Sequence, residues 1–435
     1  MESDEKKMMT NASRFELTLP KGVKDFLPVN AAKIEYLRRT LHDLYDRWGY
    51  RPVITPSLEF LDVMERGLGA GLRNKSFKFD DRQSGRLIAF TPDCTPQVAR
   101  IVATRMRERP LPLRLSYDAR VLRHEEQQLG KDREIFQSGV ELYGLKSAES
   151  DAEMIVMAVE SLQALGAEEF TLDIGQVEFS RGIMEQVSLP AQQMQLVQET
   201  IERKDLSGLR ELLAKTDLDP ELSEQILLLP RLFGGREVLD RAEAAVSNKR
   251  SREAIANLRA VLETLEVYGV EESVTFDLGV LCNLEYHTGI TFDGYLSGVG
   301  QAVCSGGRYD NLTAAFGEPI PATGFTFNLL NLLFALDQKL DEVALKRTDI
   351  LIFQPDDDKS TAQRLAQTLR RQGYSVARDM LKRDLEQTLD YATKMNYRFV
   401  MLVGPDNKSV TLRTLSDGSE QTITIAAILA GRFDV

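Results

Sequence analysis

The chain contains 435 residues, of which 43% are hydrophobic and 28% are charged, and its formal net charge at pH 7 is −12. This composition is typical of a globular protein, and the length allows two or three domains. No apolar run reaches the roughly 18 residues that a membrane-spanning helix needs, and the three cysteines and three histidines do not follow the spacing of metal ligands. We therefore expect a cytoplasmic protein without a metal or another cofactor, and the acidic balance argues against a nucleic-acid partner.

The first part of the chain alternates amphipathic helices with short strands. Residues 1–14 are polar and are expected to form a disordered tail. Apolar residues then recur at helical spacing from Ile34 to Trp48, and Gly49 is expected to end that helix. An antiparallel hairpin is expected over residues 77–90, because two short apolar runs flank a polar turn.

The remainder of the chain contains a long helical segment and, after it, a segment in which strands and helices alternate. Residues 181–268 show a helical pattern, which predicts an inserted helical subdomain within a core of residues 15–345. Late in this core, the glycine pair at residues 306–307 is typical of a tight turn, and a helix is expected over residues 325–336. Strands and helices alternate in residues 346–435, which predicts a small, separate α/β domain.

The segment between Arg123 and Glu141 carries several charged and polar residues between two apolar runs. Gln137 and Glu141 are four positions apart, so their side chains face the same side of the expected strand. Arg123 stands at the start of the preceding loop and would supply a fixed cation. This arrangement favours a buried polar pocket, although each charge taken alone would be typical of a solvated loop.

Several segments together resemble histidyl-tRNA synthetases, which belong to the class II aminoacyl-tRNA synthetases. The matching segments are residues 22–28, the helix and strand that end at Pro56 (motif 1), residues 91–95, residues 123–141 (motif 2) and residues 305–310. The resemblance implies an α+β core with a mainly antiparallel sheet flanked by helices, which dimerises through motif 1. It also implies that residues 346–435 correspond to an anticodon-binding domain.

Two positions depart from the synthetase pattern where adenylate formation depends on arginine. Cys282 stands where the family has an arginine beside the histidine carboxylate, and Asn331 replaces the arginine that binds the γ-phosphate. Loss of one preorganised cation typically lowers a rate by about 10²–10³, so we expect no catalytic residues and no aminoacylation. The histidine-binding pocket that the resemblance implies is largely present, although Asp93 replaces a glutamate of the family and His287 replaces a tyrosine. Its expected residues are Asp93, Thr95, Arg123, Gln137, Glu141, His287 and Tyr309.

A pocket that keeps its ligand groups and lacks its catalytic cations is typical of a sensor. The motifs at residues 286–295 and 304–310 resemble those of the regulatory subunits of ATP phosphoribosyltransferase. This resemblance implies a homodimer within a larger hetero-oligomer, which activates a short-form catalytic subunit and transmits feedback inhibition by histidine. Two alternatives stay open: an active histidyl-tRNA synthetase in which Lys131 or Arg133 replaces the missing arginines, and an inactive tRNA-binding paralogue.

Overall fold

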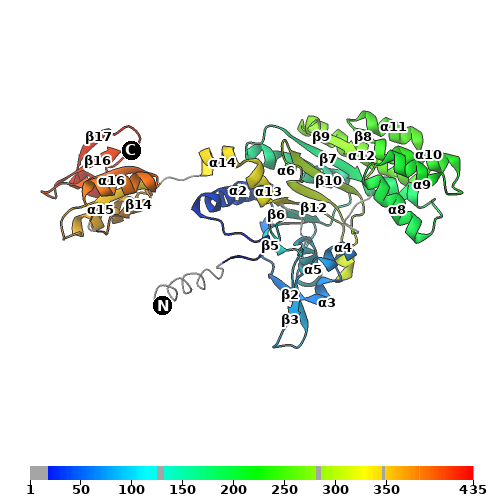
Figure 1. Ribbon diagram of the computed structural model, residues 1–435, viewed down its shortest axis with the longest axis horizontal. Helices are drawn as coiled ribbons and strands as arrows, with labels where there is room; N and C mark the ends of the chain where they lie inside the picture. The colour runs from blue at the N-terminus through cyan, green and yellow to red at the C-terminus, as the bar shows by residue number, and fades with distance from the viewer. Residues whose placement is uncertain (1–17, 125–131, 281–285, 345–347, 382, 435) are drawn as a thin grey trace, which may run out of the picture. The chain divides into compact units, whose positions relative to one another are not determined.

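The computed structural model describes five stretches of the chain, which are residues 18–124, 132–280, 286–344, 348–381 and 383–434. The tail predicted for residues 1–14 therefore lies outside the described residues. The chain divides into two compact units, Met1–Ala344 and Leu345–Val435 (Figure 1). Among the described residues, no helix combines the length and the apolar content that crossing a lipid bilayer requires.

A large sheet forms the centre of the first unit. Its strands, in spatial order, are β1 (Arg51–Pro52), β5 (Leu113–Leu122), β6 (Glu134–Tyr143), β12 (Ala322–Asn328), β11 (Cys304–Arg308), β10 (Ile290–Leu296), β7 (Phe170–Gln176), β9 (Val274–Asp277) and β8 (Phe233–Gly234). Neighbouring strands are antiparallel, except that β1 is parallel to β5 and β7 is parallel to β9. The predicted mainly antiparallel sheet is confirmed.

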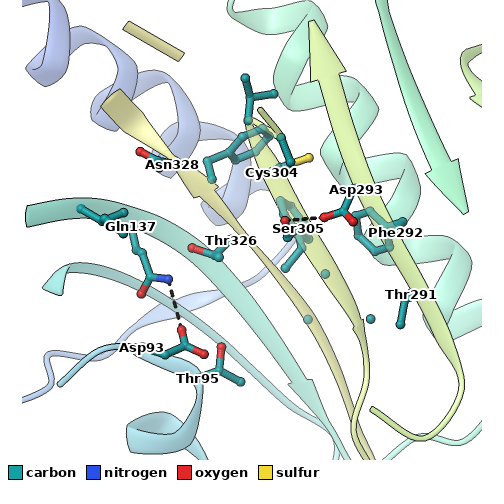
Figure 2. A pocket seen from close by; sticks show the side chains of 18 of the residues that line it. Asp93, Thr95, Gln137, Thr291, Phe292, Asp293, Cys304, Ser305, Thr326 and Asn328 are labelled. Atoms are coloured by element: carbon teal, nitrogen blue, oxygen red, sulfur yellow. Dashed lines mark hydrogen bonds between the residues drawn. The ribbon is translucent and has the colours of Figure 1, made fainter. Parts of the chain in front are cut away.

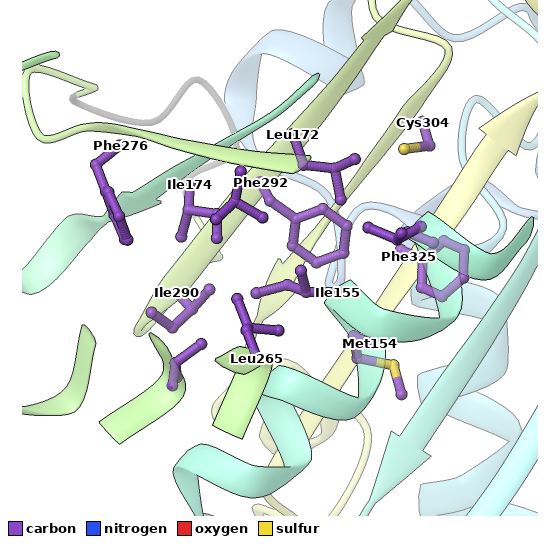
Figure 3. Close-up of a cluster of buried hydrophobic side chains, with 14 of the residues drawn as sticks. Met154, Ile155, Leu172, Ile174, Leu265, Phe276, Ile290, Phe292, Cys304 and Phe325 are labelled. Carbon is purple, nitrogen blue, oxygen red and sulfur yellow. The ribbon is translucent and has the colours of Figure 1, made fainter. Parts of the chain in front are cut away.

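Helix α6 (Ala148–Ala164) packs against the middle of this sheet. The Ser147 side chain accepts a hydrogen bond from the Ser150 amide and so caps the first turn of the helix. Met154 and Ile155 are fully buried, and Figure 3 shows them beside strand side chains such as Phe292. Helices α2 (Pro28–Arg47) and α12 (Lys249–Tyr268) contact α6, which makes one continuous core.

The chain between β7 and β9 is helical apart from the short strand β8. Its α-helices are α7 (Val177–Met184), α8 (Ala191–Glu202), α9 (Leu206–Leu213), α10 (Pro220–Leu228), α11 (Glu237–Ala245) and α12. Four of these helices begin at a side-chain cap, because the side chains of four residues each accept a hydrogen bond from an amide in the following turn, namely Gln176, Asp205, Asp219 and Asn248. Their apolar faces join the core that α6 forms with the sheet.

The predicted hairpin over residues 77–90 belongs to a smaller sheet in the first unit. Its strands, in spatial order, are β2 (Leu58–Phe60), β4 (Leu87–Phe90) and β3 (Lys78–Asp80). Helix α3 (Leu61–Met64) follows β2, and α5 (Thr95–Arg105) follows β4. The short connection between β4 and α5 brings residues 91–94 to the large sheet, where Thr91 accepts a backbone hydrogen bond from Leu122.

Two sequence predictions near the end of the first unit are wrong. The helix predicted over residues 325–336 begins only at α13 (Leu329–Ala335), after Asn328 has ended β12 and capped the helix. The predicted glycine turn lies inside β11, where a Cβ at Gly306 would be 2.5 Å from Phe325 Cβ. These small residues permit two strands to pack closely and do not mark a reversal of the chain.

The second unit is an α/β domain, as predicted. Its strands, in spatial order, are β14 (Val376–Arg378), β13 (Thr348–Phe353), β15 (Tyr397–Val403), β16 (Ser409–Thr414) and β17 (Glu420–Thr424), and its α-helices are α15 (Ser360–Arg371), α16 (Leu385–Lys394) and α17 (Ile425–Leu429). The first three strands are parallel and the last two pair antiparallel. Gly418 adopts φ +73° in the turn between β16 and β17, a conformation that glycine adopts at little cost.

Arg308, the last residue of β11, fastens the large sheet to α6 through a buried ion pair. Its Nε donates to both carboxylate oxygens of Asp151, at 3.0 and 3.1 Å, and Nη2 donates to Ser150 Oγ at 2.8 Å. Its Nη1 donates to the Asp310 carboxylate at 2.9 Å. The arginine of the motif at residues 305–310 therefore stabilises the fold, next to Tyr309 of the same motif.

Replacing Arg308 by leucine should destabilise the first unit by about 3–5 kcal/mol, because the Asp151 carboxyl would stay buried without its partner. Urea unfolding followed by circular dichroism measures this loss. The control is Arg51→Leu, which breaks an ion pair to Asp46 whose two side chains are 73% and 70% exposed. That change should alter the free energy of unfolding by less than about 1 kcal/mol, and equal losses in the two variants would contradict the assignment.

Candidate functional site

A cavity of about 470 Å³ is lined by strands β6, β10, β11 and β12 and by the segments around them. All seven residues predicted to bind histidine line it, namely Asp93, Thr95, Arg123, Gln137, Glu141, His287 and Tyr309. They come from separate elements: β6 carries Gln137 and Glu141, α5 begins at Thr95, and β5 ends immediately before Arg123. Figure 2 shows Gln137 and Asp93 pointing toward each other, with Asp293 and Ser305 on neighbouring strands.

Glu141 is the most deeply buried acid of this cavity, with 1% of its surface exposed. The Tyr309 hydroxyl donates a hydrogen bond to Glu141 Oε2. Burial raises the pKa of the Glu141 carboxyl to about 8, although the hydrogen bond from Tyr309 opposes this shift. A carboxyl that is largely protonated at neutral pH can exchange a proton with a basic ligand such as an imidazole.

A second carboxylate, that of Asp93, is held in a fixed orientation. Gln137 Nε2 donates to Asp93 Oδ1 at 3.1 Å, while Gln137 Oε1 accepts from the Cys94 amide at 3.1 Å. The Tyr286 hydroxyl donates to Asp93 Oδ2 at 3.3 Å. The glutamine therefore ties the segment before α5 to the β6 strand, and the Asp93 carboxylate is presented to the cavity as a localised acceptor.

Aromatic rings form one wall of the cavity. The ring centroids of Tyr286 and His287 are 4.9 Å apart, and those of Tyr286 and Tyr309 are 5.9 Å apart. His287 is buried, with 6% of its surface exposed. Tyr286 was absent from the predicted ligand set, and the signal that could have found it is its place directly before His287 in the motif at residues 286–295.

The charges around the cavity are mostly negative. Four carboxyl groups line it, those of Asp93, Asp132, Glu141 and Asp293, whereas Arg123 is the single arginine or lysine among the described lining residues. Arg123 Nε donates to the Pro92 carbonyl at 2.8 Å, which orients its guanidinium. Such a site favours a ligand that carries positive charge together with one carboxylate, and it disfavours a polyphosphate.

The residues that replace the two catalytic arginines of the synthetases, and the two cations considered as substitutes for them, also affect whether the cavity can bind a polyphosphate. Asn331 lines the cavity, and its Nδ2 donates to the Ala302 carbonyl at 2.7 Å, so it supplies a neutral amide. Cys282 and Lys131 lie outside the described residues. The Arg133 guanidinium lies 5.9 Å from the ring centroid of Phe77 and is not among the cavity's lining residues.

Replacing Gly324 by alanine should displace Glu141, because a Cβ at this position of β12 would overlap Glu141 Oε2 and would lie 2.5 Å from the Val140 carbonyl oxygen. We expect a loss of about 1–3 kcal/mol in the free energy of unfolding, measured by urea denaturation. The matched control is Gly300→Ala, since nothing lies within 4 Å of a Cβ there. Unchanged stability of Gly324→Ala would contradict the close approach of β12 to Glu141.

Comparison with known proteins places the chain and its fold in a family. The family model for histidyl-tRNA synthetase matches residues 22–332, and the model for the anticodon-binding domain matches residues 349–431. A structure from Bacillus halodurans, described as an ATP phosphoribosyltransferase regulatory subunit/histidyl-tRNA synthetase, superimposes with a TM-score of 0.79 at 29% identity, over 89% of this chain and 98% of that chain. Histidyl-tRNA synthetase from Nostoc superimposes with a TM-score of 0.80 at 22% identity, over 96% of this chain and 99% of that chain, which shows the shared fold.

Relatives found by sequence have a higher identity to this chain than these two solved structures do. The ATP phosphoribosyltransferase regulatory subunit of Syntrophotalea carbinolica is 61% identical over 418 residues, which cover 96% of this chain and 98% of the relative. That of Geobacter sulfurreducens is 51% identical over 430 residues, 98% of each chain. The chain therefore belongs to the family of ATP phosphoribosyltransferase regulatory subunits, which share the class II synthetase-like fold of histidyl-tRNA synthetases.

Proposed function

We propose that this chain is a non-catalytic subunit that senses histidine for a short-form ATP phosphoribosyltransferase in histidine biosynthesis. The observation that carries the proposal is the pair of carboxyl groups, Asp93 and Glu141, held at fixed places in the cavity that Arg123 also lines. Histidine presents two basic groups and one carboxylate. The chemistry of the cavity and that of the amino acid are therefore complementary.

Each part of histidine has a suitable partner in the cavity. Asp93 and Thr95 would hold the α-ammonium, with Gln137 keeping the Asp93 carboxylate in place. Glu141 would hold the imidazole, supported by Tyr309. Arg123 would approach the ligand carboxylate, and the rings of His287 and Tyr286 would close one side of the ligand.

The same charges support a non-catalytic role. Adenylate formation brings the phosphates of ATP beside the carboxylate of the amino acid, and preorganised cations stabilise that charge. Four carboxyl groups and one guanidinium line the described cavity, and Asn331 uses its amide to bind the backbone. Histidine can then act as an effector when it favours one state of the complex with the catalytic subunit, with a coupling typically of about 1–3 kcal/mol.

The test is the formation of phosphoribosyl-ATP by the catalytic subunit of the same organism, with and without this chain, and then with added histidine. We expect the chain to raise turnover and histidine to suppress it. The variant Glu141→Gln should still activate but should need at least about tenfold more histidine for inhibition, because a hydrogen bond to a charged group contributes about 1.5–3 kcal/mol.

The matched control for that variant is Glu134→Gln, on the same strand but outside the lining of the cavity. It should respond to histidine as the native chain does. A chain that leaves turnover unchanged would overturn the regulatory role. Histidine-dependent ATP–pyrophosphate exchange would instead establish a synthetase, and salt-dependent tRNA binding would favour the paralogue suggested by the anticodon-binding domain at residues 349–431.

Histidine affinity should depend on pH through Glu141. The free Glu141 carboxyl has a pKa of about 8 and a free imidazole has a pKa of about 6.5, while the bound pair is expected to share one proton. Affinity should therefore be greatest between these values, fall about tenfold per pH unit above the higher one, and fall again below the lower one. Isothermal titration at pH 5.5–9 measures this profile. The fall at high pH should be smaller in Glu141→Gln, and identical profiles would show that Glu141 does not hold the shared proton.

A further inference from the structure

A second cavity, of about 390 Å³, shares Tyr286 and His287 with the histidine site. Its other lining residues come from the segment after α3, from α7 and from the turn of 3₁₀ helix at Leu312–Ala315. Two of them are arginines, Arg66 and Arg181, and a third polar side chain is that of Asn311. Nothing in the proposed histidine site uses these three residues.

The two cavities carry opposite charge. Carboxyl groups dominate the lining of the first, whereas the described lining residues of the second include two arginines and no aspartate or glutamate. Adjacent cavities of opposite charge select different ligands, because low-dielectric walls focus the field of the groups that line them. A ligand of the second cavity should therefore be an anion.

The two guanidinium groups retain donors for such a ligand. Arg181 Nη1 donates to Glu178 Oε1 at 2.9 Å, and Glu178 also accepts from Arg250 Nε at 2.5 Å, so one carboxylate is shared between two arginines. The other guanidinium nitrogens of Arg181 donate no hydrogen bond to a described residue, and the Arg66 side chain donates none to a described residue either. Arginine presents several N–H donors in a planar fork, which matches the geometry of phosphate oxygens.

We propose that this second cavity binds a small phosphate-bearing anion through Arg66 and Arg181. The ligand is small because the cavity is a hollow of about 390 Å³ with two cations. A nucleic acid instead needs many phosphate contacts along a basic surface, and the chain has a net charge of −12. The site goes beyond histidine sensing and does not depend on it, since the two ligands use different charged groups.

Isothermal titration with inorganic pyrophosphate, at constant ionic strength and without histidine, tests the proposal on the full chain. The native chain should bind saturably, and Arg66→Gln and Arg181→Gln should each weaken binding about tenfold or more, as expected for loss of a charge-assisted hydrogen bond. Arg181→Lys keeps the positive charge, so its affinity for pyrophosphate should fall less than that of Arg181→Gln. Inorganic phosphate and ATP, titrated in parallel, distinguish a single phosphate group from a nucleotide as the preferred form.

Two controls separate this site from general charge effects. Arg259→Gln matches Arg181→Gln, because the two side chains are 38% and 37% exposed and both pair with carboxylates on helices. Arg203→Gln removes an arginine whose side chain is 77% exposed. Both controls should bind pyrophosphate as the native chain does.

Three results would overturn the proposal: no saturable binding by the native chain, equal weakening in the controls, or binding of tRNA without binding of pyrophosphate. Histidine titrated into the same variants distinguishes this inference from the proposed function. Histidine binding without pyrophosphate binding removes the second site alone. Pyrophosphate binding without histidine binding supports the second site and removes the proposed effector.

Discussion

The burial of one carboxyl group, that of Glu141, is the constraint on which the rest of the pocket depends. Its neighbours on β6, Val140 and Leu142, are fully buried, so the strand lies in the middle of the core and Glu141 cannot turn to solvent. Burial raises the pKa of this carboxyl to about 8, so that most of it is protonated at neutral pH. The fold accommodates it by placing Tyr309 as a donor on one side and Gly324 on the other.

That accommodation depends on three neighbouring strands. β6, β12 and β11 are adjacent in the sheet, and their register sets Glu141 directly opposite Gly324. Arg308 then fastens β11 to α6, which fixes the strand that leads into Tyr309. A donor and an acceptor that belong to one rigid sheet keep their separation better than groups on mobile loops do. The buried ion pair between Arg308 and Asp151 therefore helps to hold Tyr309 in its place in the pocket.

The sequence could predict the pocket better than the strands that frame it. Successive side chains of a strand point to opposite faces of the sheet, so the four-residue spacing alone placed Gln137 and Glu141 on the same face of β6. The role of Gly306 and Gly324 could not be predicted in the same way, because a glycine needed for close approach of another strand looks like a glycine needed for a turn. Residues 325–328 of β12 were predicted to be helical for a related reason: apolar residues recur from the end of β12 into α13, and the capping hydrogen bonds of Asn328 that mark the true start of the helix cannot be read from the sequence. Which of these side chains bind histidine stays a prediction.

The residues between the two cavities raise a question of coupling. Tyr286 and His287 line both hollows, and Tyr286 also donates to Asp93. Any coupling between the two proposed ligands would therefore pass through this hydroxyl and this imidazole. By thermodynamic reciprocity, an anion that strengthened histidine binding would itself be bound more tightly, by the same factor, when histidine is present. Among the described lining residues, only Tyr286 and His287 belong to both cavities. Ligands of opposite charge on the two sides of this pair would attract each other, which would add to the effect.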